Sequence, residues 1–212
     1  MAASPPSDVA ISTLQLSKLM REICPPTPAD KGERIMADLE KVLAQPRGIS
    51  GSPKEFLEQI MNLMFRHLDF SELAAAIKDS NSGRSKYVAF MGMRKEVENA
   101  YRKLSYDMSD TAYLTSYPRI KCTSLVDFFP AELRPEREGE LETFNRPALI
   151  EMQRTSLEML REGDYFSASF YGRRGDLLGW FELARTRDGK IPSGNNLKWL
   201  SMICAVVGKV LG

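Results

Sequence analysis

The stretch that decides the fold is Tyr165-Phe-Ser-Ala-Ser-Phe-Tyr171, followed after a short gap by Leu177-Leu-Gly-Trp-Phe-Glu-Leu-Ala-Arg-Thr186. The first segment alternates between two faces and places Phe166 and Phe170 on the same one. A period of two that is rich in aromatic residues is typical of a β-strand. The gap, Gly172–Asp176, contains two glycines, which adopt the backbone angles of tight turns at little cost. The sequence therefore predicts a β-hairpin here.

A turn and an amphipathic helix follow the hairpin. Residues 187–192 have the composition of a turn, and Ser193 or Asn195 can cap a helix. From Leu197 to Leu211, apolar residues recur at helical spacing. A hairpin and an amphipathic helix each need an apolar surface to cover, so we expect an α+β domain around this end of the chain. The helix residues expected to be buried against the hairpin are Leu200, Ile203, Val207 and Leu211.

The sequence before residue 106 predicts helices. Apolar residues recur at helical spacing, and Ser52 with Glu55 has the pattern of a capping box. We therefore expect a helical N-terminal half, residues 1–105. Its predicted helices cover residues 14–23, 30–45, 53–68, 72–78 and 87–106.

Residues 106–212 are predicted to form an α+β domain with an antiparallel sheet and a closing C-terminal helix. Short runs rich in β-forming residues predict strands over 113–117 and 121–129, and prolines interrupt the sequence after each of them. Apolar spacing predicts a further helix over 147–162, with Asn145 as its cap. The predicted order is strand, strand, helix, strand, strand, helix.

The composition is that of a globular protein. Charged residues make up 27% and hydrophobic residues 43%, and the net charge of +1 gives no global attraction to nucleic acid or membranes. No apolar run is long enough for a transmembrane helix. The three cysteines, Cys24, Cys122 and Cys204, are too few and too widely spaced for a disulfide framework. We expect a cytoplasmic location or another intracellular reducing compartment.

The sequence contains no recognisable catalytic or metal-binding motif. His67 is the only histidine, and its place near a predicted helix C-terminus suits a structural role. Gly83–Lys86 and Gly172–Gly175 combine glycine with basic residues, but neither has the glycine spacing of a phosphate-binding motif. We therefore expect no enzymatic activity, no catalytic residues, no metal site and no cofactor.

Basic residues gather in the segment 84–121. Between residues 84 and 103 there are six Lys or Arg against two Glu, with Tyr87, Phe90 and Tyr101 among them. Cations bind phosphates and aromatic rings stack on unpaired bases, although the same residues also suit an ordinary solvated face. The candidate nucleic-acid-binding residues are Arg84, Lys86, Arg94, Lys95, Arg102, Lys103, Arg119, Lys121 and, in the hairpin turn, Arg173 and Arg174.

The hairpin and the helix after it resemble the end of a GAF domain, over about a quarter of the chain. PAS and other sensor-type α+β folds end in a similar way. The resemblance implies ligand sensing or dimerisation, and it assigns no binding residue. The matching segments are 165–171, 172–176, 178–183, 187–192 and 197–211.

Three functions are compatible with these features. The first is a non-enzymatic protein-interaction or assembly protein, such as a regulatory adaptor or a viral structural component, which binds a protein partner or self-associates. Eleven methionines favour it, because methionine-rich apolar surfaces adapt to partners, although the same residues also fill cores. The second is a nucleic-acid-binding protein that uses the basic segment 84–121, with RNA as a candidate partner. The third is a small-molecule sensor with a GAF-like domain.

Overall fold

The computed structural model describes residues 30–44, 52–107, 118–133 and 139–212. The predicted helix over 14–23, the predicted strand over 113–117 and Cys24 lie outside these ranges. The chain divides into two compact units, residues 1–43 and residues 44–212.

The described part of the first unit is helix α2 (Lys31–Ala44), which confirms the helix predicted over 30–45. The carboxylate of Asp30 accepts a hydrogen bond from the backbone N–H of Glu33 at 2.9 Å, so an acidic side chain caps the helix. Ile35 and Leu39 are its buried residues.

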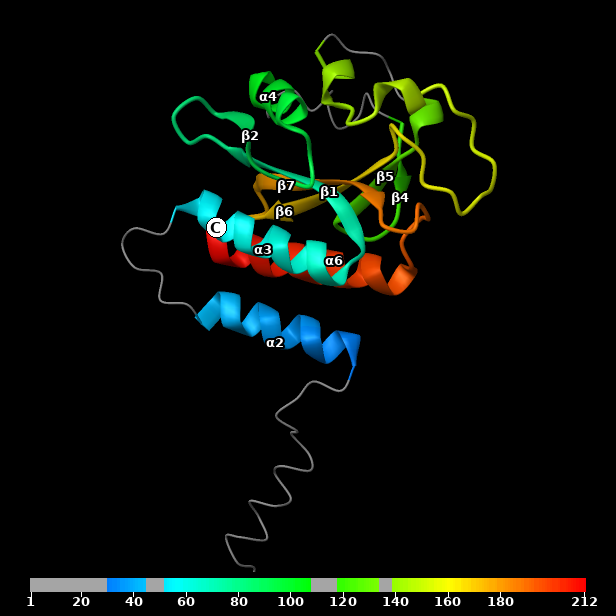
Figure 1. Cartoon of the computed structure of the whole chain (residues 1–212). Helices are drawn as coiled ribbons and strands as arrows, with labels where there is room; N and C mark the ends of the chain where they lie inside the picture. Colours follow the sequence, from blue (N-terminus) through cyan, green and yellow to red (C-terminus); the bar gives the residue numbers. More distant parts are fainter. Residues whose placement is uncertain (1–29, 45–51, 108–117, 134–138) are drawn as a thin grey trace, which may run out of the picture. The chain divides into compact units, whose positions relative to one another are not determined.

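In the described part of the second unit, seven strands form one sheet in the order β3-β2-β1-β7-β6-β5-β4, and all neighbouring strands run antiparallel (Figure 1). The strands are β1 (Phe70–Lys78), β2 (Arg84–Met91), β3 (Ser105–Asp107), β4 (Ile120–Lys121), β5 (Val126–Phe129), β6 (Tyr165–Tyr171) and β7 (Leu177–Thr186).

Helices cover both faces of this sheet. α3 (Pro53–His67) and α6 (Gly194–Leu211) pack on one face, and α4 (Lys95–Lys103) lies on the other (Figure 1). The capping box predicted for α3 is present, with Ser52 and Glu55 hydrogen bonded to each other's backbone. No helix within the described ranges is both long and apolar enough to cross a membrane. The remaining elements are the 3-10 helices η1 (Ala131–Leu133), η2 (Leu141–Thr143) and η3 (Pro147–Leu149).

The centre of the sheet is the pair β1 and β7, which aligns Phe70 with Thr186. β1 contains the segment predicted as a helix over 72–78, so that prediction was wrong. Alanine and leucine are strong helix formers, but residues 73–76 are all fully buried in a strand that is covered on both faces. In such a strand polar and apolar residues do not alternate, so the sequence gives no strand signal.

The helix predicted over 87–106 was also wrong in its first half, which is β2. The chain turns at Gly92, where φ is +73° and a Cβ atom would lie 1.7 Å from the carbonyl oxygen of Ser71. Only glycine fits this position. The helix that follows, α4, is shorter than predicted.

The helix predicted over 147–162 is wrong apart from the single 3-10 turn η3. Two arginines bind the backbone of this segment from their side chains: Arg161 donates to the carbonyl oxygen of Ile150, and Arg154 donates to that of Met159. Charged side chains therefore satisfy carbonyl groups that a helix would satisfy with its own N–H groups.

The α+β class, the antiparallel sheet and the closing C-terminal helix are confirmed, and β6 has the predicted bounds. The helical N-terminal half is a wrong prediction, because β1 and β2 belong to the same sheet as β5–β7. The predicted boundary between residues 105 and 106 falls within β3, inside the second compact unit.

The inner face of α6 lies against β6. Leu200, Ile203 and Val207 are fully buried, as predicted, whereas Leu211 is only partly buried. At Gly208 a Cβ atom would lie 2.2 Å from the backbone oxygen of Tyr171. The helix therefore approaches the strand at a distance that no side chain allows.

Because Leu200 has no exposed surface, we expect Leu200→Ala to lower the free energy of unfolding by about 2–5 kcal/mol. Urea denaturation monitored by circular dichroism measures this change. Met202 lies on the same helix with 39% of its surface exposed, so Met202→Ala should change stability by less than about 0.5 kcal/mol. Equal effects of the two substitutions would contradict the packing described here.

Candidate functional site

Two small cavities adjoin each other on the sheet face that α4 covers. Each has a volume of about 30 Å³, which is room for roughly two water molecules. We call the first the charged cavity, because Glu72, Arg146, Arg161, Asp164 and Arg185 are among its lining residues. The second is the tyrosine cavity. The residues that line both are Tyr101, Thr143, Phe144, Tyr165 and Glu182.

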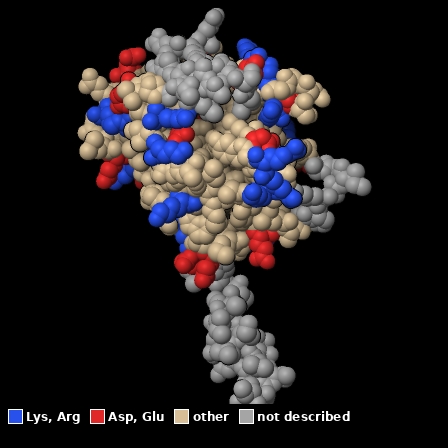
Figure 2. Space-filling model, turned by 180° about the vertical axis from the view of Figure 1, so that it is seen from behind, with Lys and Arg blue, Asp and Glu red and all other residues tan. Residues whose placement is uncertain are grey.

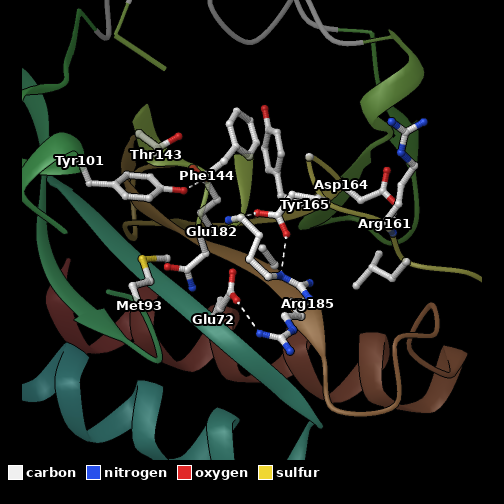
Figure 3. A pocket seen from close by; sticks show the side chains of 16 residues that line it. Glu72, Met93, Tyr101, Thr143, Phe144, Arg161, Asp164, Tyr165, Glu182 and Arg185 are labelled. Atoms are coloured by element: carbon white, nitrogen blue, oxygen red, sulfur yellow. Dashed lines mark hydrogen bonds and ion pairs between the residues drawn. The ribbon is translucent and has the colours of Figure 1, made fainter. Parts of the chain in front are cut away.

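Glu182 lies where the two cavities meet. It belongs to β7 in the middle of the sheet, in register with Ala74 of β1 and Ser167 of β6. Its carboxylate accepts hydrogen bonds from the hydroxyl of Tyr87 at 2.5 Å and from that of Tyr101 at 2.7 Å. Tyr101 and Glu182 are labelled in Figure 3. Two tyrosines from β2 and α4 therefore hold one carboxylate in a fixed position.

The hydroxyl of Tyr101 is held in its protonated form. Burial raises the pKa of Tyr101 well above its usual value, and the negative charge of Glu182 raises this pKa further. Tyr101 therefore remains a hydrogen-bond donor to Glu182 throughout the physiological pH range.

Ion pairs surround the charged cavity. The buried carboxylate of Glu72 on β1 lies 3.3 Å from the guanidinium of Arg185 on β7 (Figure 3). Arg185 has a φ of +49°, a left-handed conformation that is uncommon outside glycine. Arg146 forms a second pair with Glu162, also at 3.3 Å. The cavity thus has charges of both signs in its wall.

A network of charged side chains ties the segment beside the charged cavity to η1. Arg154 binds both carboxylate oxygens of Glu132 at 2.9 Å and also binds Asp164 at 2.9 Å. The hydrogen bond from Arg154 lowers the pKa of Glu132 to about 2. Arg161 pairs with Glu132 at 3.5 Å, and its Nε is buried without a hydrogen-bond partner among the described residues.

The ten cations predicted to bind nucleic acid lie on different elements. Most of them have partners within the fold: Arg84 donates to Ser105, and Lys95 pairs with Glu98 at 3.1 Å. Arg119 and Lys121 both lie within 4 Å of the carboxylate of Asp127.

The structure does not bring these cations together. Arg84 and Lys86 belong to β2, while Lys121 belongs to β4 at the far edge, with four strands in between. That separation is roughly 24 Å at about 4.8 Å per strand spacing. The loop with Arg173 and Arg174 joins β6 to β7. On the face in Figure 2, Lys and Arg alternate with acidic and uncharged residues. Within the described ranges, the ten predicted cations therefore do not form one cluster, and nucleic-acid binding stays an untested prediction.

Among the described residues, no group of three or more His, Cys, Asp or Glu side chains is arranged to hold a metal ion. Cys204 is fully buried, and burial raises the pKa of its thiol. Cys122 is half-buried, and its pKa is raised for the same reason. Neither thiol is activated as a nucleophile.

The sequence prediction missed every residue of the two cavities as a site residue. One signal was available: Glu182 is an acidic residue inside the apolar run Leu178-Gly-Trp-Phe-Glu-Leu183. A charged side chain in an otherwise buried strand needs hydrogen-bond or ion-pair partners, and such positions are frequently functional.

No protein-family model matches the chain, and no curated protein matches it. Two solved structures are similar in fold. One is the GAF domain of a phosphoenolpyruvate-protein phosphotransferase from Coxiella burnetii, with 13% identity, a TM-score of 0.52, and coverage of 84% of this chain and 90% of that one. The other is a GAF domain/HD domain protein from Geobacter sulfurreducens, with 12% identity, a TM-score of 0.51, and coverage of 74% and 90%.

These similarities extend the resemblance predicted for the hairpin and closing helix to most of the chain. They concern the fold alone, because the sequence identities are low. The chain has a GAF-like fold.

The ion pair between Glu132 and Arg154 makes stability depend on pH. The pKa of Glu132 is lower in the folded state than its usual 4.5, so the pair stabilises the fold above about pH 4.5 and loses this effect as the pH falls toward 2. We expect the urea midpoint of the native protein to fall more between about pH 6 and pH 3 than that of Glu132→Gln. The exposed Glu142 provides a control, and Glu142→Gln should behave like the native protein. Parallel pH profiles for all three proteins would contradict this role.

Proposed function

We propose that this chain is a small-molecule-sensing regulatory domain whose ligand enters the two adjoining cavities beneath α4. The observation that carries the proposal is the set of fixed polar groups that line these cavities: the carboxylate of Glu182, held by two tyrosine hydroxyls, and the buried carboxylate of Glu72, paired with the exposed guanidinium of Arg185. Concave sites that combine apolar walls with a few fixed polar groups are typical of ligand binding.

The fold adds support of a weaker kind. The two similar structures are described as a GAF domain of a phosphotransferase and as a GAF domain/HD domain protein. Fold does not determine function, so this likeness raises the expectation of ligand sensing without replacing the argument from the cavities.

The elements that cover the cavities, α4 and the segment after η2, would transmit the signal of ligand binding. Asn145 accepts a hydrogen bond from the backbone N–H of Arg94 at 3.1 Å and donates one to the carbonyl oxygen of Gly92 at 3.4 Å. These bonds connect the segment after η2 to the start of α4. Each cavity holds only about two waters, so a larger ligand must displace this cover and thereby select a different conformation of α4.

In this proposal the chain acts by binding and not by catalysis. A conformational change in α4 has an effect only when something responds to it, so the sensor would act on a protein partner or on a second copy of itself. This part of the proposal retains the protein-interaction role inferred from the sequence.

Thermal denaturation with a library of small metabolites tests the proposal. A ligand that binds the native state raises the melting temperature in proportion to the logarithm of its concentration over its Kd. We expect at least one such ligand, and we expect Ala184→Leu to abolish its effect, because Ala184 lines the charged cavity and a larger side chain would fill it.

Ala205→Leu is the matched control, since Ala205 is exposed on α6. It should respond to the ligand as the native protein does. A library without any stabilising compound, or a ligand that stabilises Ala184→Leu as strongly as the native protein, would overturn the proposal.

A further inference from the structure

We propose that the ligand of this site is a small primary organic amine, bound as its ammonium ion in the tyrosine cavity. This inference rests on the sensing function proposed above and names the chemical class of its ligand. It is derived from the residues that line the tyrosine cavity and from their charges, orientations and space.

The wall of the tyrosine cavity is aromatic and acidic. Its lining residues contribute five aromatic rings, and among the described residues that line it there is no Lys, Arg or His. Two carboxylates, Glu140 and Glu182, also line it, together with Leu104 and Thr143. The aromatic residues are Tyr87, Tyr101, Tyr106, Phe144 and Tyr165.

Both carboxylates are fixed by tyrosine hydroxyls. Tyr87 and Tyr101 donate to Glu182, and Tyr106 donates to Glu140 at 3.3 Å. Glu140 is 8% exposed, so this carboxylate too lies in a largely dry environment. An ammonium group offers three N–H donors and a positive charge to such acceptors, and charge-assisted hydrogen bonds are stronger than neutral ones.

The rings add attraction for a cation. The ring of Tyr87 lies 4.7 Å from that of Tyr101 at 71°, and 6.2 Å from that of Tyr106 at 79°. Rings set nearly perpendicular to one another present electron-rich faces in different directions around a small space. An ammonium group near such faces is stabilised by cation–π attraction, which increases as water is excluded.

The volume restricts the ligand further. A space of about 30 Å³ suits a small group such as an ammonium with its neighbouring methylene, and a quaternary ammonium ion has no N–H donors for the two carboxylates. The rest of the ligand would extend past Glu182 into the charged cavity, which shares five lining residues with the tyrosine cavity.

Isothermal titration calorimetry on the full chain, with n-propylamine as the probe, tests this assignment. n-Propanol, propionate and choline provide the neutral, anionic and quaternary comparisons. We expect n-propylamine to bind about tenfold or more tightly than each of the other three, since only it combines charge, N–H donors and small size.

Glu182→Gln keeps the shape of the side chain and removes its charge, so it should weaken n-propylamine binding about tenfold or more. Glu96→Gln is the matched control: it removes one negative charge from the exposed side of α4 and should leave the affinity unchanged. If Glu182→Gln does not fold, as judged by circular dichroism, then Glu140→Gln is measured in its place with the same expected loss.

Three results would overturn the proposal. These are equal binding of n-propylamine and n-propanol, undiminished binding by the folded glutamate variant, and no binding of n-propylamine at all. If the metabolite library yields an anionic or neutral ligand that Ala184→Leu blocks, then the amine class is wrong while the sensing function stands. If neither the library nor n-propylamine yields any binding, both fail.

Discussion

The carboxylate of Glu182 lies in the middle of the sheet, and a charge in that position has to be hydrogen bonded. An ionised group away from water is costly unless donors compensate for the lost hydration. The donors are hydroxyls from β2 and α4, which reach across the sheet face toward β7. One partly buried carboxylate therefore ties α4 to the sheet and lies at the wall between the two cavities. On the side of the tyrosine cavity its neighbours are aromatic rings, which gives that cavity its acidic and aromatic character.

The two faces of the sheet are stabilised in different ways. On the side of α3 and α6, fully buried aliphatic side chains such as Leu57, Ile60, Leu200 and Ile203 provide the contacts. On the side of the cavities, ion pairs of Arg154 and Arg161 hold a segment with little regular structure. The stability of this side therefore depends on charged hydrogen bonds, whereas the side of α3 and α6 depends on apolar burial. The proposed sensing function would use this division, with α3 and α6 as a rigid base.

The sequence predicted the type and bounds of an element well where one face of that element is polar. The hairpin, α3 with its capping box, and α6 all alternate or repeat clearly, and their bounds agree with the structure. Prediction failed for β1, because a strand buried on both faces has the composition of a helix. It failed again over 147–162, where arginine side chains replace the hydrogen bonds of a helix.

The candidate site could not be predicted from local patterns at all. Its residues come from β2, α4 and β7, and Tyr87 is 95 positions away from Glu182. Periodicity reports which residues share a face of one element, but not which elements come together. Only the isolated glutamate in the β7 segment gave a sign of a buried polar site.

The pairing of β1 with β7 also determines when the fold can be completed. These central strands align Phe70 with Thr186, so more than half of the chain separates two neighbours in the middle of the sheet. Contacts between distant residues require a large loop to close before they stabilise anything, and such topologies fold slowly. During synthesis, β1 and β2 leave the ribosome as an isolated hairpin with an unpaired apolar edge. That edge stays open to other chains until the final strand arrives, which makes the nascent protein a candidate for chaperone protection.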